Sequence, residues 1–522
     1  MKTKFYKNKN TIAKLFQKRS AFDLTHSKSL TCKMGKLIPT YVQEVLPGST
    51  FKIQQHQVVR LLPLQAPTMD RVDITTHFFF VPNRLIWSNW ENFITGGEDG
   101  DDASVFPTIS SGENGKDVGT LWDYLGAPTN YYKSDGVTPV KVPNFKVSAL
   151  PFRAYQLIYN EYYRDQNLVD KALISKADGL DTITSLVLQN RSWKKDYFTS
   201  CMPFAQRGED VFLPIGTEAP VTGIVKRNQV FNSGITGYDA NGPVSGVDGA
   251  WINPSSDNTD FAVLNNGSGL PDIKADLSQA TAVTINELRQ ASSLQRFFER
   301  LARGGSRYAE VILSHFGVVS SDARLQRPEY LGGSKSPVVI SEVLQTSSTD
   351  STSPQANMAG HAFTLNSNIP INASFEEHGY IIGITNVQPY GSYVQSCPKH
   401  FLRNSRFDFF WKDFASLGEQ IVENQEIYPN SADPTGTFGY LPRYEEYRHG
   451  VNSVHGYFKT SLNYWHMARL FDNEPTLSKE FIEADPTDRI FAVEDSQPVL
   501  IQCLNKVTGF LPVPKVAQPS LI

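Results

Sequence analysis

Cysteine and long hydrophobic runs are scarce in this chain of 522 residues. Its four cysteines, Cys32, Cys201, Cys397 and Cys503, lie far apart and form no Cys-x-x-Cys pair. This spacing excludes a dense disulfide framework and the usual zinc modules, and it fits a reducing compartment. No stretch approaches the roughly 18 apolar residues that a membrane-spanning helix needs, and the basic amino terminus has no continuous apolar core of a secretory signal. We therefore expect no membrane insertion.

The common motifs of catalysis and phosphate binding are incomplete. The run Gly304-Gly-Ser306 continues to Tyr308 and so lacks the last glycine of a nucleophile elbow. The acidic run EDGDD at 98–102 fails the spacing of a calcium loop in both countings that place an aspartate first. Cys397-Pro-Lys-His400 has no second pair of metal ligands at a matching spacing. We expect no enzyme activity, no cofactor and no metal.

Positive charge is concentrated at the amino terminus. Residues 1–19 hold seven Lys and Arg and no acid, and the remaining chain has 42 basic against 53 acidic residues, a net charge of −11. A basic arm on an acidic body is typical of a protein that touches a polyanion through its end. A solvated tail is an equally good interpretation. The candidate nucleic-acid-binding residues are Lys4, Lys7, Lys9, Lys14, Lys18 and Arg19.

Alternation with period two indicates short strands separated by long loops. In the segment 72–81, Val72, Ile74, Phe78 and Phe80 share one face, whereas Asp73 begins an opposite face that we expect to be exposed at its start. Further strands are expected at 51–62, 338–344, 380–385, 406–411, 489–493 and 499–504. Because no regular helices alternate with these strands, the pattern favours an antiparallel sandwich over βαβ units.

Two helices are expected from three-and-four spacing. One lies near 151–166 and begins with Pro151. The other covers 285–303, follows a capping box at Thr284 to Glu287, and carries an apolar stripe that needs a core. We expect Gly304 to be the left-handed residue that ends it, and Ser306 to cap a further helix that runs to residue 315 or 316.

The arginines of this second region allow several interpretations. A phosphate loop precedes a helix, whereas here the Gly-Gly pair ends one, so an anion could sit only at the second helix start. Glu299 lies at pairing distance from two arginines, which dilutes the charge. We expect contacts between subunits first and DNA contacts second, with the candidate residues Arg296, Arg300, Arg303 and Arg307.

Between residues 217 and 283 the composition shifts to Gly, Asn, Asp, Ser and Pro. A loop of this length is unusual inside a compact domain, so we expect an outward insertion with small strands of its own. Its aromatic residues favour partial order over plain disorder.

Several long strings carry a family resemblance. LQRFFERLARGGSRYAEVILSHFGV from Leu294, MGKLIPTYVQEVLPGSTF at 34–51, THFFFVPNRLIWSNWENFITGG at 76–97 and FGYLPRYEEYRH near 440 all fit one pattern. With them the chain resembles the major capsid proteins of the Microviridae, small phages with single-stranded DNA, and above all the gokushovirus branch. The resemblance covers nearly the whole chain outside the 217–283 insertion.

The resemblance implies a mainly β fold: a single viral jelly roll of two antiparallel four-stranded sheets, with long loop insertions and a few α-helices. It divides the chain into a basic arm (1–20), a first part of the body (21–216), an exposed protrusion (217–283) and the rest of the body (284–522). It also implies a T=1 icosahedral shell of about sixty copies around circular single-stranded DNA, found in the virion and made in the cytoplasm of a bacterial host.

Further partners are also implied by the resemblance. They are a host cell-surface receptor, a small basic DNA-packaging protein and a pilot protein. In gokushoviruses the insertion gathers at the three-fold axes for host attachment, and we take Tyr238, Trp251 and Phe261 as its candidate contact residues. The alternative is a jelly-roll protein that binds or hydrolyses carbohydrate, which a cleft with two carboxylates about 5–10 Å apart would favour.

Overall fold

The computed structural model describes residues 19–209, 211, 285–346, 357–493 and 497–515, and the backbone of short strands between 221 and 275. Its contacts divide the chain into two compact units: a body formed by 1–205 and 304–522, and a second unit formed by 206–303. The second unit thus includes nearly all of the helix that follows the insertion.

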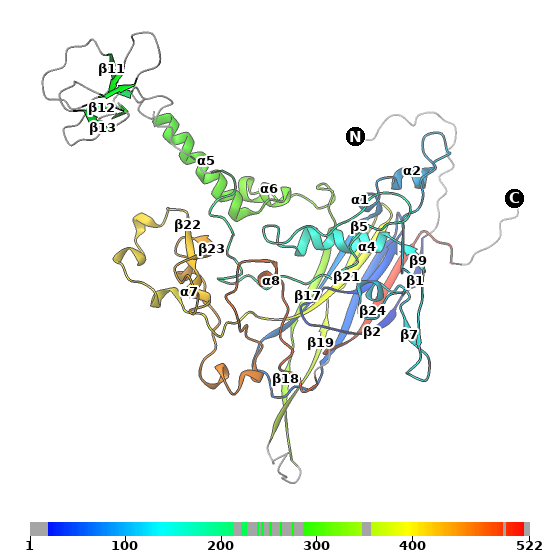
Figure 1. Ribbon diagram of the computed structural model, residues 1–522. Helices are drawn as coiled ribbons and strands as arrows, with labels where there is room; N and C mark the ends of the chain where they lie inside the picture. The colour runs from blue at the N-terminus through cyan, green and yellow to red at the C-terminus, as the bar shows by residue number, and fades with distance from the viewer. Residues whose placement is uncertain are drawn as a thin grey trace. The chain divides into compact units, whose positions relative to one another are not determined.

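Two antiparallel sheets form the body (Figure 1). The first sheet contains β1 (Ser20–Asp23), β2 (His26–Cys32), β4 (Thr50–Leu61), β18 (Ile340–Leu344), β19 (Met358–Ser367), β20 (Ile371–Ser374) and β24 (Val499–Leu511). The second contains β3 (Ile38–Val45), β5 (Val72–Pro82), β17 (Glu329–Pro337) and β21 (Gly379–Pro389).

The pairing order defines the fold. The main strands in chain order are β2, β3, β4, β5, β17, β19, β21 and β24, and their neighbours run β2-β24-β4-β19 in one sheet and β3-β21-β5-β17 in the other. First and last strands therefore lie side by side, as the registers between β2 and β24 show. This is the jelly roll that the sequence predicts. The first sheet has one edge strand, β18, in addition to the expected four. β1 pairs with β24 beyond the end of β2, and β20 pairs with β4 beyond the end of β19, so neither adds a position to the strand order.

The space between the sheets is filled from both sides. Phe78 and Phe80 of β5 pack with Phe51 and Ile53 of β4 and Val507 of β24, all at most 2% exposed. Each such side chain contributes about 1.5–3 kcal/mol when it is fully buried. The alternation of β4 and β24 places every second residue in this core, as a half-covered antiparallel sheet requires.

A polar ladder also crosses the core. The Gln57 side chain of β4 donates to Thr385 Oγ1 of β21 at 2.7 Å and accepts from Asn366 of β19 at 2.8 Å. The Thr76 hydroxyl of β5 donates to the same Gln57 oxygen at 3.2 Å. These bonds join both sheets, and they satisfy buried groups that would otherwise destabilise the fold.

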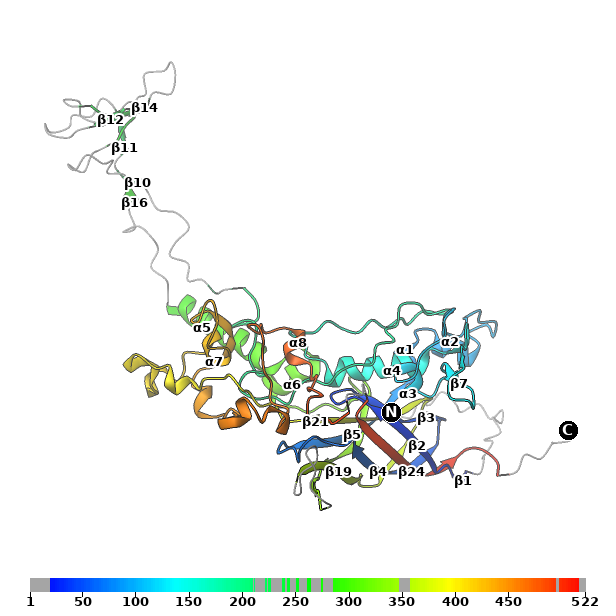
Figure 2. The same ribbon diagram turned by 60° about the horizontal axis from the view of Figure 1, so that its bottom comes forward.

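Two helices cover the second sheet in the described part of the body. Figure 2 shows α1 (Asn83–Ile86) and α4 (Leu150–Ile158) on one side of the sandwich, while β19, β4, β24 and β2 form its other surface. Phe79 of β5 and Ile382 of β21 point away from the first sheet and pack with Tyr155 of α4. The chain continues from α4 into a π-helical turn, η2 (Tyr159–Tyr163).

Shorter elements complete the body. They are α2 (Trp90–Thr95), α3 (Leu121–Tyr124), α6 (Tyr308–Phe316), α7 (Asn424–Ile427), α8 (Lys479–Ile482), the pairs β6 (Thr108–Ser110) with β9 (Lys146–Ser148), β7 (Tyr131–Tyr132) with β8 (Pro139–Val140) and β22 (Glu419–Glu423) with β23 (Thr437–Pro442), and the 3-10 turns η4 (Lys399–Phe401), η5 (Arg406–Asp408), η6 (Lys412–Phe414), η7 (Glu445–Tyr447), η8 (Gly456–Lys459) and η9 (Asn463–Trp465).

The second unit contains three small groups of strands and one long helix. The strands are β10 (Val221–Thr222) with β16 (Lys274–Ala275), β11 (Ile224–Lys226) with β15 (Phe261–Val263) and β14 (Ala250–Ile252), and β12 (Gly237–Asp239) with β13 (Gly242–Val244). The helix is α5 (Ile285–Gly304). The predicted small strands of the insertion are therefore present.

Two predicted strands are wrong. Residues 406–411 form turns, because the Ser405 hydroxyl and the Asp408 carboxylate bond to nearby backbone amides and stabilise a 3-10 start. Residues 489–493 form turns apart from one isolated bridge at Phe491. The expected exposure of Asp73 is also wrong, since its side chain is buried beside Lys194 and Lys335.

The ends of the predicted helices need corrections as well. Gly305, with φ of 90°, takes the left-handed position, and Gly304 is the last helical residue. Arg307 precedes α6 in place of Ser306, and its backbone N–H donates to the Glu310 carboxylate at 3.1 Å. Of the expected apolar stripe on α5, Ile285, Leu288 and Leu294 are exposed rather than packed on a core.

Candidate nucleic-acid and subunit interfaces

Five strands of the first sheet contain no carboxylate, although Asp123 of α3 borders the hollow that Arg60 and Leu500 line. Strands β2, β4, β19, β20 and β24 contain no Asp or Glu, and the carboxylates of this sheet are confined to Asp23 of β1 and Glu342 of β18. The second sheet, by contrast, contains Glu44, Asp73 and Glu329. We call the surface formed by β2, β4, β19, β20 and β24 the acid-free face.

Cations and apolar side chains alternate on the acid-free face. Lys52, His56 and Arg60 of β4 and Lys506 of β24 point outward, because their neighbours along each strand are buried. The Arg60 guanidinium lies 5.3 Å from the centre of the Phe363 ring of β19. In the described part of the chain, Lys52 and Arg60 form no ion pair. Their charges are therefore available to an external anion.

Exposed apolar groups share this surface with the cations. Leu365 is 67% exposed, Leu504 45% and Phe510 44%. Cations that track a backbone, interspersed with apolar and aromatic groups that contact bases, are the chemistry of single-stranded nucleic-acid binding. No local motif in the sequence marks this face, since its residues come from strands as distant as β2 and β24, which are more than 450 positions apart.

The basic arm joins the fold at the edge of this same sheet. Arg19 is exposed and directly precedes β1, which pairs with β24 from Ser20↔Leu511 to Asp23↔Thr508. The other candidates of the arm, Lys4, Lys7, Lys9, Lys14 and Lys18, lie outside the described residues. The strand that follows the arm, β1, and the acid-free face are thus parts of one sheet.

The candidate arginines of the second helical region separate into two groups. Arg296, Arg300 and Arg303 are exposed on α5. Arg296 donates to Ser292 Oγ at 3.1 Å, and Glu299 accepts from Gln295 at 3.2 Å. These three guanidinium groups have the exposure that a partner surface requires.

Arg307 instead serves the interior of its own chain. Its guanidinium pairs with Glu310 at 2.9 Å and donates to the carbonyl oxygens of Asn160 and Arg164 at 2.8 and 2.9 Å. Those carbonyls belong to the π turn and the residue after it, where a helical end leaves acceptors unsatisfied. Local sequence could not reveal this role, because the acceptors lie more than 140 positions away.

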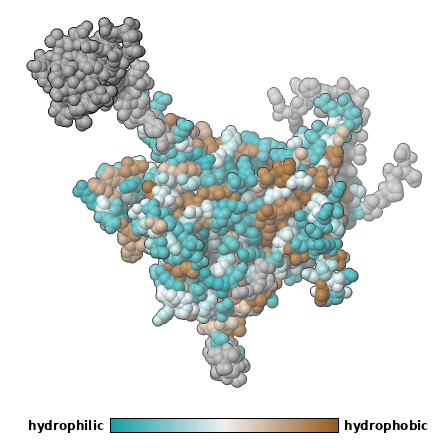
Figure 3. All heavy atoms as spheres, viewed as in Figure 1, coloured by the Kyte–Doolittle hydropathy of each residue, from teal (hydrophilic) through white to brown (hydrophobic). Residues whose placement is uncertain are grey.

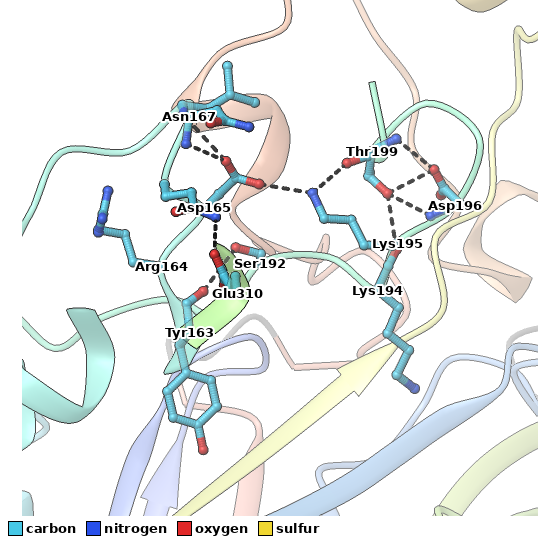
Figure 4. A network of polar contacts seen from close by, with 12 residues as sticks. Tyr163, Arg164, Asp165, Asn167, Ser192, Lys194, Lys195, Asp196, Thr199 and Glu310 are labelled. Carbon is cyan, nitrogen blue, oxygen red and sulfur yellow. Dashed lines mark hydrogen bonds and ion pairs between the residues drawn. The ribbon is translucent and has the colours of Figure 1, made fainter. Parts of the chain in front are cut away.

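A polar network extends this anchor. Gln166 donates to Glu310 at 2.7 Å, and Asp165 pairs with Lys195 at 2.9 Å (Figure 4). Lys195 also donates to the Thr199 carbonyl oxygen at 2.8 Å. The network ties the chain after η2 to α6 and to the loop 192–199.

Exposed hydrophobic residues mark a further surface. Figure 3 shows hydrophobic atoms gathered over α4. The loop that packs on α4 through bonds from Gln156 to the Ser185 and Val187 carbonyls exposes four large apolar side chains, namely Leu173 (65%), Leu180 (56%), Ile183 (58%) and Val187 (62%). Such a concentration is typical of a surface that another protein covers.

The candidate contact residues of the insertion lie in its strands. Tyr238 is in β12, Trp251 in β14 and Phe261 in β15, and Ile252 pairs with Phe261. The positions of their side chains lie outside the described part of the structure.

The cysteines of the core have low reactivity. The cysteines are free, and burial raises the pKa of the Cys32 and Cys503 thiols to about 12, so they are poor nucleophiles at neutral pH. The described residues contain no cluster of His, Cys, Asp and Glu fit for a metal ion and no helix with the length and apolarity to cross a bilayer.

One cavity of about 370 Å³ is lined by two carboxylates, Glu426 and Glu446. Glu426 pairs with Lys399 at 2.9 Å, and Glu446 with Arg403 at 3.2 Å. Both carboxylates thus hold loops together.

Comparison with known proteins agrees with the fold. A family model described as "Capsid protein (F protein)" matches residues 12–521. Capsid protein VP1 of Chlamydia phage 1 is 36% identical over 585 residues, which cover 97% of this chain and 96% of the relative. For VP1 of Bdellovibrio phage phiMH2K the identity is 38% over 495 residues, 91% and 90% of the two chains. For VP1 of Spiroplasma virus 4 it is 33% over 544 residues, 96% and 95%.

These matches span both units of the chain, including the strands of the jelly roll and the insertion between them. The relatives are structural capsid proteins rather than enzymes. The chain therefore belongs to the capsid protein (F protein) family, as a structural major capsid protein of the gokushovirus type of Microviridae.

Proposed function

We propose that about sixty copies of this chain close into a T=1 icosahedral shell around circular single-stranded DNA, with the acid-free face and the basic arm directed at the genome. Membership in the capsid family implies self-assembly and a place in the virion. The observation that carries the DNA-facing part is the run of five strands without a carboxylate, joined to an arm with seven cations in its first 19 residues.

Physical chemistry supports this orientation. The chain without its arm has a net charge of −11, so most of its surface repels a polyanion. The acid-free face is a surface where Lys52, Arg60 and Lys506 can neutralise phosphates while Phe363 and Phe510 contact unpaired bases. The opposite side, which α4 and its apolar loop cover, is then left for contacts with neighbouring subunits.

The insertion 217–283 has the composition of an exposed, variable tip. We propose that it forms a protrusion at the three-fold axes and binds a host cell-surface receptor. Synthesis in the cytoplasm of a bacterial host, and cooperation with a small basic DNA-packaging protein and a pilot protein, belong to the same proposal.

Reconstruction of purified particles by cryo-electron microscopy tests the orientation directly. We expect an icosahedral shell with one copy per asymmetric unit, and DNA density against Lys52 and Arg60 in full particles that empty particles lack. A shell that directs β4 and β24 outward would contradict the proposal, and purified protein that stays monomeric in all assembly conditions would contradict the shell itself.

A further inference from the structure

A second concentration of positive charge lies on the side of the sandwich away from the acid-free face. A cavity of about 630 Å³ opens there, between β5, β17, the π turn and the segment 191–195. Its walls are largely aromatic, and they are formed in part by His77, Phe79, Tyr162, Tyr163, Trp193 and Tyr330. Because Phe78 and Phe80 point into the core between the sheets, the alternation of β5 directs His77 and Phe79 to the opposite side.

Cations exceed carboxylates at this cavity. The cavity is lined by Arg191, Lys194, Lys195 and one carboxylate, Asp322, which pairs with Arg327 at 3.1 Å. Behind this wall, Lys194 at 2.5 Å, Lys335 at 3.0 Å and Arg71 at 3.5 Å share the carboxylate of Asp73. Burial by itself would raise the pKa of Asp73, but the hydrogen bonds from Lys194 and Lys335 lower it to about 2. One carboxylate cannot balance three cations, so the cluster keeps an excess of positive charge.

Arg191 is the cation of the cavity wall that has the weakest polar contacts. Its guanidinium lies 5.9 Å from the centre of the Tyr163 ring, and its polar contact is a long 3.5 Å bond to Asn386 Oδ1. Burial lowers its pKa, and it forms no ion pair with any residue that the structure describes. A partly buried guanidinium without a carboxylate is costly, and a carboxylate from outside would relieve that cost.

The chain itself carries a matching acidic segment. The turn after α2 contains Glu98, Asp99, Asp101 and Asp102 within five residues, and the first three side chains are exposed. Asp102 is used locally, since it accepts from Ser104. Gly96, Gly97 and Gly100 have φ near 80°, a left-handed conformation that allows the chain to turn sharply after α2.

The acidic turn and the cavity are formed by different parts of the body. In Figures 1 and 2, α2 is at one end of the sandwich, and α6, which Gln166 and Glu310 join to the cavity region, is toward the other. None of residues 98–102 lines the cavity within one chain, so we look to a neighbouring copy as the source of the turn. A donor and an acceptor on different parts of the body give a head-to-tail contact, which closes a ring when copies repeat around a symmetry axis.

We propose that the aromatic, cationic cavity accepts the acidic turn 98–101 of a neighbouring copy of this chain. The proposal needs the assembly that capsid family membership implies, and it is independent of which face meets the DNA. Carboxylates of the turn lie against Arg191 and the Asp73 cluster, and the glycines allow the backbone to enter between the tyrosine rings.

Charge reversal tests the contact from both sides. E98K/D99K/D101K places cations opposite cations, and R191E/K335E places carboxylates opposite carboxylates. We expect each variant to lower the yield of closed particles by about tenfold or more, measured by sedimentation and electron microscopy. The variant with all five substitutions restores the opposite signs, and we expect it to recover assembly.

A matched control separates a specific contact from net charge. D170K/E342K/E376K changes three exposed acids elsewhere on the body in the same way, and we expect it to assemble like the unchanged chain. Circular dichroism of each purified variant checks folding, and the exposed turn variant alone still decides if R191E/K335E fails to fold. Normal assembly of E98K/D99K/D101K would overturn the proposal. Reduced DNA content with intact assembly in R191E/K335E would instead show that the cavity binds phosphate, which also overturns it.

Discussion

At the scale of single residues, one buried ion pair holds the helical side of the body together. Arg153 of α4 and Asp181 are both fully buried and 2.8 Å apart, and Arg153 also donates to the carbonyl oxygens of Ile86 and Ala177. Asp181 further accepts from Thr184 at 2.6 Å. The pair therefore fastens α1 and the loop 177–184 onto α4.

We predict that Arg153→Met destabilises the subunit by about 3–5 kcal/mol, because it leaves the Asp181 carboxylate buried without its cation. Urea unfolding of purified subunits measures the change. The double variant R153M/D181N removes the stranded charge, and we expect it to be more stable than R153M alone. A loss below 1 kcal/mol in R153M would show that water replaces the guanidinium.

The titration of His77 makes the stability of the subunit depend on pH. Its Nδ1 lies 2.8 Å from the Tyr163 hydroxyl, with Tyr330 and Arg191 also facing it. Burial, together with the charge of Arg191, lowers its pKa from 6.5 to about 4. Between these values the unfolded chain holds the proton and the folded chain does not, so stability falls as the pH decreases from 6.5 to 4.

We predict that His77→Gln removes about 1–3 kcal/mol of this acid-dependent loss. The measurement is the urea midpoint of wild type and H77Q at pH 7 and pH 4.5. The difference between the two chains should grow toward acid, with H77Q losing less. Parallel curves would mean that His77 titrates normally in the folded state.

At the scale of elements, the acid-free face and the basic arm divide the expected DNA binding between them. About five phosphate contacts from the arm give a slope of log affinity against log salt near −3.5, at roughly 0.7 per contact with single strands. We predict that removal of residues 2–18 reduces the magnitude of the slope by about this amount, and that K52Q/R60Q/K506Q reduces it by about 2.

Affinity for a single-stranded oligonucleotide, titrated over a range of salt concentrations, measures both effects. E342Q on the edge strand β18 serves as a control that leaves the five strands intact. An unchanged slope after truncation would assign DNA binding to other parts of the chain.

At the scale of the whole molecule, the division into two units predicts that they can be separated genetically. The body contains both sheets and all four described core clusters, and the second unit contains the insertion. We predict that deletion of residues 225–280 with a short glycine-serine replacement leaves particle assembly within about twofold of wild type, as loop changes outside a core do.

The same particles should lose attachment to host cells. Electron microscopy measures assembly and a cell-binding assay measures attachment. Failure to assemble would show that the insertion holds the shell together. Assembly with normal attachment would place the receptor site elsewhere on the body.

The spacing of apolar residues predicted those helices and strands whose pattern is visible in a short segment of sequence. The alternation in β4 and β5, the spacing in α4 and α5 and the start of β24 are all visible within a window of ten residues. The predicted strand at 406–411 was wrong, because an apolar run alone does not distinguish a strand from turns that side-chain hydrogen bonds stabilise. The long strings shared with capsid proteins identified the family without any knowledge of the contacts.

By itself, the sequence determined the fold class, the family and the placement of charge along the chain. The tertiary structure decided which of those charges meet. The acid-free face exists because β24 lies between β2 and β4, and β19 lies beside β4, although β19 and β24 are hundreds of residues from β2 and β4 in the chain. Arg307 is an anchor because distant carbonyls face it. Electrostatic and hydrogen-bond energies depend on distances in space, and a chain that closes its first strand against its last sets those distances through pairing that no local window contains.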